Sequence, residues 1–135
     1  MTTVPTPIPN VLAYAPPQQI STIGAGAKQA QTAPAGAAVN AYIDCNAGSL
    51  HQLELVGAAS TTTVEFINPQ PGQVINLYVK QSASGSDLIT WINCLWASAT
   101  PPTLTTTASH LDWLRFVYDD VTARWSGFVV AADFS

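Results

Sequence analysis

Charged side chains are scarce in this sequence: only 9% of its 135 residues are Asp, Glu, Lys or Arg, against about 25% in an ordinary globular domain. The four cationic residues, Lys28, Lys80, Arg115 and Arg124, are too few and too scattered to neutralise a run of phosphates, and the net charge is −4. We therefore expect no nucleic-acid partner. A surface with so little charge repulsion is typical of a protein that packs against other proteins.

Long hydrophobic runs, a secretory signal and paired-cysteine motifs are missing as well. No apolar run approaches the ~20 residues that a membrane-spanning helix needs. The N-terminal stretch MTTVPTPIPN has neither the basic nor the apolar region of a signal peptide. We expect no membrane partner and no export by the general route. The two cysteines, Cys45 and Cys94, have no CxxC spacing, and we expect free thiols in preference to a disulfide.

What the sequence does have, from Asn40 onward, is a series of short strand-like runs separated by turn signals. In QVINLYVKQ, residues 73–81, apolar residues at 75, 77 and 79 alternate with Asn76, Tyr78 and Lys80, as in a strand with one buried face. No segment shows sustained helical periodicity. About seven or eight strands at this spacing predict an all-β fold, an antiparallel β-sandwich or barrel, over residues 41–135.

Residues 1–40 differ in composition, and we expect them to form an extended N-terminal arm. Alternating prolines in TVPTPIPN enforce extended or polyproline-II backbone and forbid a helix or a central strand. The only charged side chain before residue 41 is Lys28. Because disordered tails are usually charged, this arm is expected to become ordered on a neighbouring subunit; about 40 extended residues reach roughly 130 Å. Its expected partner contacts are Val4, Pro5, Ile8, Val11, Leu12, Tyr14 and Ile20.

The last two strand-like runs predict a hairpin. FVYDDVTARWSGF, residues 116–128, has a polar turn between two aromatic-rich arms. Aromatic pairs that face each other across strands stabilise a sheet by about 0.2–1 kcal/mol each relative to alanines. We therefore expect Phe116, Tyr118, Trp125 and Phe128 to form the core of this hairpin.

Ser109, His110 and Asp112 are the residue types of a hydrolase triad, standing almost side by side. In a strand, His110 and Asp112 would share one face and Ser109 would point to the other, and no G-x-S-x-G elbow is present. We interpret Ser109 and His110 as the close of a loop, and Asp112 as an acceptor for backbone N–H groups or an arginine at the start of a strand.

The sequence offers no recognisable metal or phosphate site. His51 and His110 are far apart, the carboxylates form no calcium-loop pattern, and GAGA lacks the strand and helix of a phosphate loop. We expect no catalytic, cofactor-binding or metal-ligating residues. Four tryptophans could stack on a sugar, although core and interface positions are the more common use. They are Trp91, Trp96, Trp113 and Trp125.

Residues 84–128 carry a further pattern: a Gly/Ser break, a T-W strand, W…PTLT, a spacer, D-x-x-x-F-x-Y-D, a short turn and W-x-G. This pattern resembles one in virion structural proteins of tailed bacteriophages, which include head decoration proteins, head fibres and tail fibres. The matching positions are Trp91, Trp96, Pro102, Leu104, Thr105, Asp112, Phe116, Tyr118, Asp119, Trp125 and Gly127.

The resemblance covers about a third of the chain and has two departures. Ala97-Ser98 stands where that family usually has Gly-Gly, and Asp119-Asp120 stands where it has Asp-Gly. The resemblance implies a trimeric, jelly-roll-like β module without catalytic residues.

These observations favour a capsid decoration, or cement, protein that is not an enzyme. It would bind the outer surface of the assembled head, after assembly in the host cytoplasm, and stabilise it by bridging subunits. Its expected partners are the major capsid protein and copies of itself, as a homotrimer. Two alternatives stay open: a head-fibre or tail-fibre module that contacts a host glycan, and a small hydrolase that uses Ser109 and His110.

Overall fold

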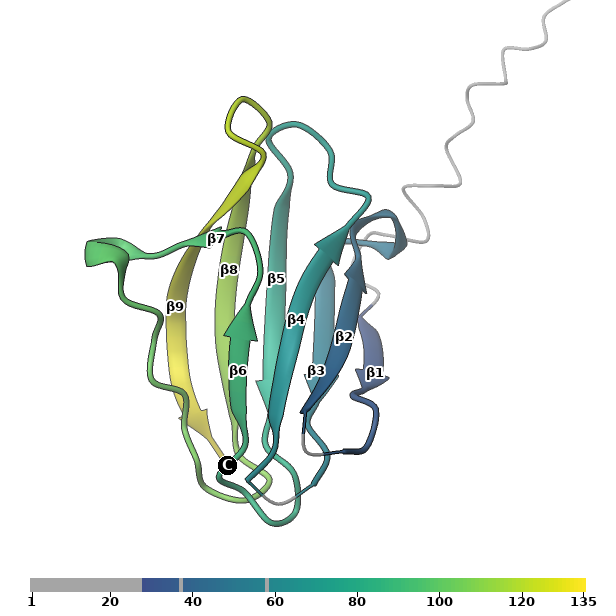
Figure 1. The fold of residues 1–135 in the computed structure, drawn as a ribbon, viewed down its shortest axis with the longest axis vertical. Coiled ribbons are helices and arrows are strands. Elements are labelled where there is room, and N and C mark those ends of the chain that lie inside the picture. The colour runs from purple at the N-terminus through teal and green to yellow at the C-terminus, as the bar shows by residue number, and fades with distance from the viewer. Residues whose placement is uncertain (1–27, 37, 58) are drawn as a thin grey trace, which may run out of the picture.

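The computed structural model describes residues 28–36, 38–57 and 59–135 (Figure 1). This part of the chain contains nine strands and two single-turn 3₁₀ helices, so the predicted all-β class is confirmed. The strands are β1 (Gln29–Thr32), β2 (Ala38–Asp44), β3 (Leu50–Glu54), β4 (Thr61–Ile67), β5 (Val74–Lys80), β6 (Leu88–Trp91), β7 (Cys94–Leu95), β8 (Leu111–Asp119) and β9 (Arg124–Phe134). The 3₁₀ helices are η1 (Cys45–Ala47) and η2 (Ala97–Ala99).

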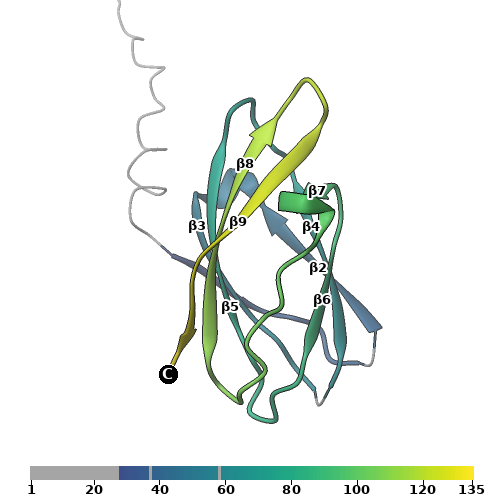
Figure 2. The same ribbon diagram turned by 90° about the vertical axis from the view of Figure 1, so that its left-hand side faces the viewer.

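The strands form two facing sheets, which Figure 2 shows nearly edge-on. The larger sheet has the order β1-β3-β5-β8-β9-β7, and the smaller one has the order β2-β4-β6. Side chains at alternate positions of each strand point into the space between them, as the burial pattern of β4 and β5 shows. The fold is therefore a two-layer β structure with one core.

Along its first six strands the chain winds as a spiral that passes back and forth between the two sheets. From β3 on, each of these strands pairs in parallel with the strand two positions earlier in the chain. Parallel neighbours need a crossover connection, and here the crossover is a strand of the opposite sheet. The antiparallel hairpin of β8 and β9 then pairs with β5 and extends the larger sheet.

The prediction of an antiparallel sandwich is wrong in this respect, because five of the seven strand pairings are parallel. Residue alternation and turn signals look the same whether the next strand pairs with the last one or crosses to the opposite sheet. The connections after β2, β3, β4 and β5 all cross. Jelly rolls are antiparallel architectures, so the first six strands also depart from the jelly-roll-like arrangement that the resemblance implies.

The ordered β structure begins ahead of the expected boundary at residue 41. β1 lies within the segment assigned to the arm and pairs with β3 from Gln29 to Thr32. Its neighbour Ala33 is only 3% exposed and belongs to the core. A parallel ladder uses backbone groups, so a stretch of small and polar residues can join a sheet without large side chains of its own.

The predicted hairpin is present, with Tyr118 opposite Trp125. Phe116 and Trp125 are buried in the core, and Tyr118 is partly buried against it. Phe128 is 54% exposed, and its assignment to the hairpin core is wrong. It lies opposite Arg115 on β8, and side chains at that register point away from the smaller sheet.

Candidate interaction surface

Asp112 has a structural role in the connection between loop and strand. Its side chain is 3% exposed, and its Oδ2 accepts the Thr105 backbone N–H at 2.7 Å while its Oδ1 accepts that of Asp133 at 2.9 Å. The acidic partner of His110 is Asp133, whose Oδ1 is 2.6 Å from the His110 Nδ1. Asp112 therefore accepts backbone N–H groups, as interpreted from the sequence, and its carboxylate is directed away from a Ser109–His110 relay.

Both cysteines are free thiols. Burial is the main cause that raises the pKa of each to about 12, and for Cys45 the negative charge of Asp44 adds to it. Thiols with such a pKa are poor nucleophiles and poor metal ligands at neutral pH. The described residues contain no group of three His, Cys, Asp or Glu side chains placed to hold a metal ion.

The four tryptophans occupy three different environments. Trp125 is 2% exposed and packs between Phe66 and Tyr118 in the core. Trp91 and Trp96 are partly buried, with ring centroids 5.5 Å apart. Trp113 lies on the outer face of the larger sheet.

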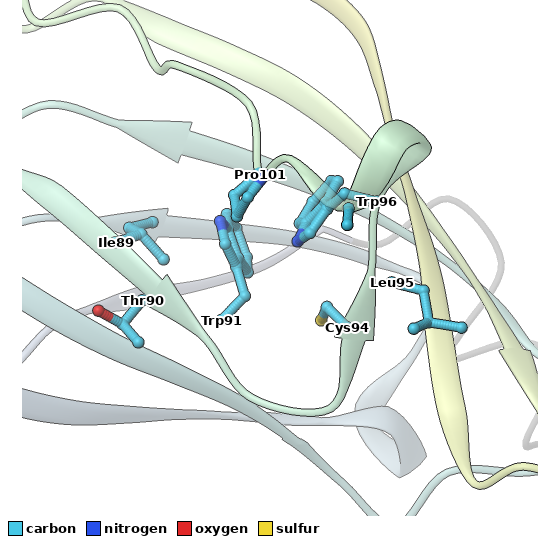
Figure 3. A pocket seen from close by; sticks show the side chains of 8 residues that line it. Ile89, Thr90, Trp91, Cys94, Leu95, Trp96 and Pro101 are labelled. Carbon is cyan, nitrogen blue, oxygen red and sulfur yellow. The ribbon is translucent and has the colours of Figure 1, made fainter.

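Trp91 and Trp96 line a cavity of about 440 Å³ beside β6, shown in Figure 3. Their rings approach edge to face, with Pro101 close to the Trp91 ring. We call this cavity the tryptophan pocket. Its lining residues are Ile89, Thr90, Trp91, Cys94, Leu95, Trp96, Ala99 and Pro101. The pocket is predominantly apolar and its size falls in the range of small-ligand sites.

Gly127 explains how Trp96 is held. A Cβ atom at Gly127 would come within 3.0 Å of three atoms of the Trp96 ring, so only glycine leaves room for it. Trp96 also packs edge-on against the buried Phe116. Several positions of the sequence pattern described above are thus in mutual contact, and they share a packing role around this pocket.

The outer face of the larger sheet carries a second group of aromatic residues. Tyr78 on β5 stacks on Trp113 on β8 with centroids 5.7 Å apart, and the Arg115 guanidinium lies 5.7 Å from the Trp113 ring. Asn76 Oδ1 accepts hydrogen bonds from Trp113 Nε1 and Arg115 Nε, each at 3.1 Å. These contacts fix the orientation of the Trp113 and Arg115 side chains.

The group extends to both sides. Lys28 Nζ lies 5.5 Å from the Tyr78 ring centroid and donates to Gln52 Oε1 at 2.7 Å. On the other side, Phe128 of β9 lies opposite Arg115. We call this surface the aromatic face. It comprises Lys28, Asn76, Tyr78, Trp113, Arg115 and Phe128.

The outer face of the smaller sheet has a different character. The outward side chains of β4 are Thr61, Thr63, Glu65 and Ile67, while β6 adds Leu88 and Thr90 and β2 adds Asn40 and Tyr42, so this face is mainly polar with isolated apolar residues. Antiparallel or mixed sheets that face water normally show such polar outer positions. The aromatic face departs from that norm, and it carries Trp, Tyr and Arg, the residue types that dominate binding energy at protein interfaces. It is therefore the better candidate for a contact surface.

Sequence reasoning missed this face, although a signal was present. Alternation in residues 73–81 placed Asn76, Tyr78 and Lys80 on the side away from the core, but the register that sets Tyr78 beside Trp113 is not visible in one strand. The expected arm contacts Val4, Pro5, Ile8, Val11, Leu12, Tyr14 and Ile20 all lie outside the described residues.

Comparison with known proteins gives no family for this chain. No protein-family model matches it, and no curated protein matches its sequence. Among the described residues, no helix is long and apolar enough to cross a membrane. The case for function therefore rests on the surfaces described above.

Proposed function

We propose that this chain is a capsid decoration protein of a tailed bacteriophage, which binds the outer surface of the assembled head and bridges its subunits. The observation that carries the proposal is the aromatic face, where Asn76 holds the side chains of Trp113 and Arg115 in place. Preorganised anchors lose little side-chain entropy on binding. The resemblance of residues 84–128 to virion proteins points to a partner within a virion, and for a decoration protein that partner is the major capsid protein.

The physical role is stabilisation by linkage. A protein that binds the assembled shell but not its separated subunits stabilises the shell by about 2.7 kcal/mol per site at a free concentration one hundred times its Kd. A standard interface buries about 800 Å² on each partner. In this proposal the aromatic face supplies the central contact, copies of the chain associate as a homotrimer, and the N-terminal arm extends across neighbouring subunits.

Reconstitution on heads that lack the protein tests this function. We expect the full chain to bind in hundreds of copies and to raise the temperature at which heads release their DNA. Trp113→Ala and deletion of residues 1–20 should each reduce binding at least tenfold while the β structure stays folded by circular dichroism. Tyr42→Ala is the matched control, because Tyr42 is 49% exposed on the smaller sheet. Full binding by the Trp113→Ala variant or by the truncated chain would overturn this mechanism.

The tryptophan pocket favours one second candidate, a fibre or receptor-binding module that contacts a host glycan. Aromatic rings at the mouth of a pocket of about 440 Å³ are suited to stacking on a sugar. In that case Trp96→Ala would reduce adsorption to host cells without loosening the particles, and only a few to a few dozen copies would be present in each particle.

A further inference from the structure

The outer edge of β6 has backbone groups that the described part of the sheet does not use. Within residues 28–36, 38–57 and 59–135, β6 pairs with β4 alone. Leu88 donates its N–H to Ser60 O at 2.8 Å and Ile92 donates to Val64 O at 3.0 Å. Since successive residues of a strand point their N–H and C=O groups to opposite sides, those of Ile89 and Trp91 point away from β4.

This outer edge borders two apolar cavities. Ile89 and Trp91 line the tryptophan pocket, and Ile89 also lines a second cavity of about 260 Å³ beside Leu104. The full lining of the second cavity is Leu88, Ile89, Pro102, Thr103, Leu104 and Thr106. The shared residue places the two cavities next to each other along the edge. An extended segment laid along β6 would meet backbone hydrogen-bonding groups and apolar walls together, as in recognition by strand addition.

The chain itself contains a segment suited to such an edge. In Val4–Asn10, VPTPIPN, prolines occupy positions 5, 7 and 9. In an extended strand, the N–H and C=O groups of positions 4, 6, 8 and 10 therefore all face one side, and the prolines all face the other. A strand of this kind can pair along one edge and blocks pairing along its second edge. Residues that precede proline favour extended or polyproline-II backbone, so the segment is already close to a strand conformation.

The composition of the segment also matches the groove. Residues 1–27 contain no Asp, Glu, Lys, Arg or His, so no charged side chain would be buried against Trp91 and Trp96. One face of the extended segment carries Val4 and Ile8 together with the uncharged polar Thr6 and Asn10, and the other face carries the three prolines. Either face therefore suits the cavities.

We propose that the outer edge of β6 is a strand-acceptor site for Val4–Asn10 of a neighbouring copy of this chain. The described part of the chain begins beside β1, at one end of the larger sheet, whereas β6 is the last strand at the other end of the smaller sheet (Figure 1). The 17 residues between Asn10 and Lys28 reach roughly 60 Å. A path to the molecule's own β6 must go round the domain, whereas a neighbour can present its β6 beside β1.

In this arrangement each copy places its Val4–Asn10 segment on β6 of the next copy, so the contacts are head to tail. Such contacts close into a ring when the rotation between copies allows it. The inference concerns how copies of the chain associate and does not depend on their binding to heads, but it is incompatible with a glycan-binding fibre module that needs the same pocket. Occupation by the segment would also fill the pocket that a glycan would otherwise use.

Cross-linking to an introduced thiol, Leu95→Cys, tests the placement in the full chain. Leu95 lines the pocket and is 42% exposed, whereas the native thiols of Cys45 and Cys94 are buried enough to react poorly with a maleimide. In the Leu95→Cys background, Ile8→Cys and Pro7→Cys place a thiol on each face of the segment, and Ser21→Cys is the control outside it. With a short bis-maleimide we expect Ile8→Cys or Pro7→Cys to give covalent oligomers in at least fivefold excess over Ser21→Cys. Equal yields at Ser21→Cys, links only within one chain, or no link from either face would overturn the proposal.

A proline pair tests the hydrogen bonds separately. Thr6→Pro with Ile8→Pro removes N–H donors from the pairing side, and Thr2→Pro with Thr3→Pro makes the same chemical change outside the segment. We expect the first pair to shift the protein at least tenfold toward monomer in sedimentation equilibrium, and the second to leave association unchanged. If both pairs associate like the unmodified chain, or if both lose association equally, strand addition by Val4–Asn10 is wrong.

Discussion

Asp87 connects three segments at one end of the sandwich. Its carboxylate accepts the backbone N–H and the hydroxyl of Ser60 at 3.0 and 2.9 Å, and the backbone N–H of Ser82 at 3.3 Å. The side chain of Gln81 bonds the N–H and the C=O of Asp87 at 2.9 and 3.0 Å. These residues stand at the start of β4, the end of β5 and the start of β6, so the network joins the two sheets. Asp87 is fully buried.

Asp87→Asn should lower the free energy of unfolding by about 1–3 kcal/mol, the usual effect of leaving a buried donor without its acceptor. The asparagine amide can accept on one side only, so either Ser60 or Ser82 loses its partner. Urea unfolding followed by tryptophan fluorescence measures the change. Asp44→Asn is the control, because Asp44 accepts hydrogen bonds from Asn68 and Asn46 at an exposed site. An Asp87→Asn variant as stable as the unmodified protein would show that the network is dispensable.

The same carboxylate makes stability depend on pH. Burial, the largest influence, raises the pKa of Asp87, but the hydrogen bonds from Ser82 and Ser60 together outweigh it and leave the pKa below its ordinary value. A pKa lowered by folding contributes stability that is present above the unfolded value of about 3.9 and is lost as the pH falls through the folded value. Stability measured from pH 6 to pH 2 should therefore decline less steeply in Asp87→Asn than in the unmodified protein.

The buried hydroxyl of Thr62 lowers the stability of the folded state. It is fully buried on β4, and its hydroxyl has no hydrogen-bond partner among the described residues. Thr62→Val keeps the shape and the β-branch and removes the unpaired hydroxyl. We expect the free energy of unfolding to rise by about 1 kcal/mol. Thr63→Val, on the outer side of the same strand, is the matched control and should change stability by no more than about 0.5 kcal/mol. A destabilised Thr62→Val variant would reveal a partner for the hydroxyl.

At the level of elements, sequence pattern located most strands but not their neighbours. The run read from the sequence at residues 73–81 contains β5, because alternation is a property of one strand. The hairpin of β8 and β9 was found because its turn and its aromatic pairs are local in sequence. The pairing of β3 with β5 could not be predicted in this way, because β4 separates the two strands in the sequence and nothing in either strand encodes its partner.

The larger sheet should not be equally stable along its width. β5 and β8 lie at its centre and contribute Ile75, Leu77, Leu114 and Phe116, all with 0% exposure. β1 and β7 are short strands at its two ends. Native-state hydrogen exchange should therefore show the highest protection for amides of β5 and β8, close to the free energy of global unfolding, and protection at least a hundredfold lower in β1 and β7. Uniform protection across the sheet would contradict this ordering.

The candidate surface was harder to predict than the strands, because it exists only after the sheet is assembled. Tyr78 and Arg115 are 37 residues apart in sequence, and both contact Trp113. A single strand shows that Tyr78 points away from the core, but not that Lys28 lies over its ring. Conversely, the residues that looked chemical in sequence, Ser109, His110 and Asp112, support a turn and the end of β9.

At the scale of the whole molecule, the two outer faces should differ in their tendency to associate. Lowering the pH from 7 toward the isoelectric point of about 4.6 reduces the net charge of −4 and therefore the repulsion between copies. Sedimentation velocity should show self-association that increases over that range.

Trp113→Ser with Phe128→Ser should shift the concentration at half-association upward at least tenfold, because it removes the exposed aromatic contacts of one face. Tyr42→Ser, on the smaller sheet, should leave that concentration unchanged. An equal effect of both variants would mean that association follows overall hydrophobicity and that the aromatic face has no special part in it.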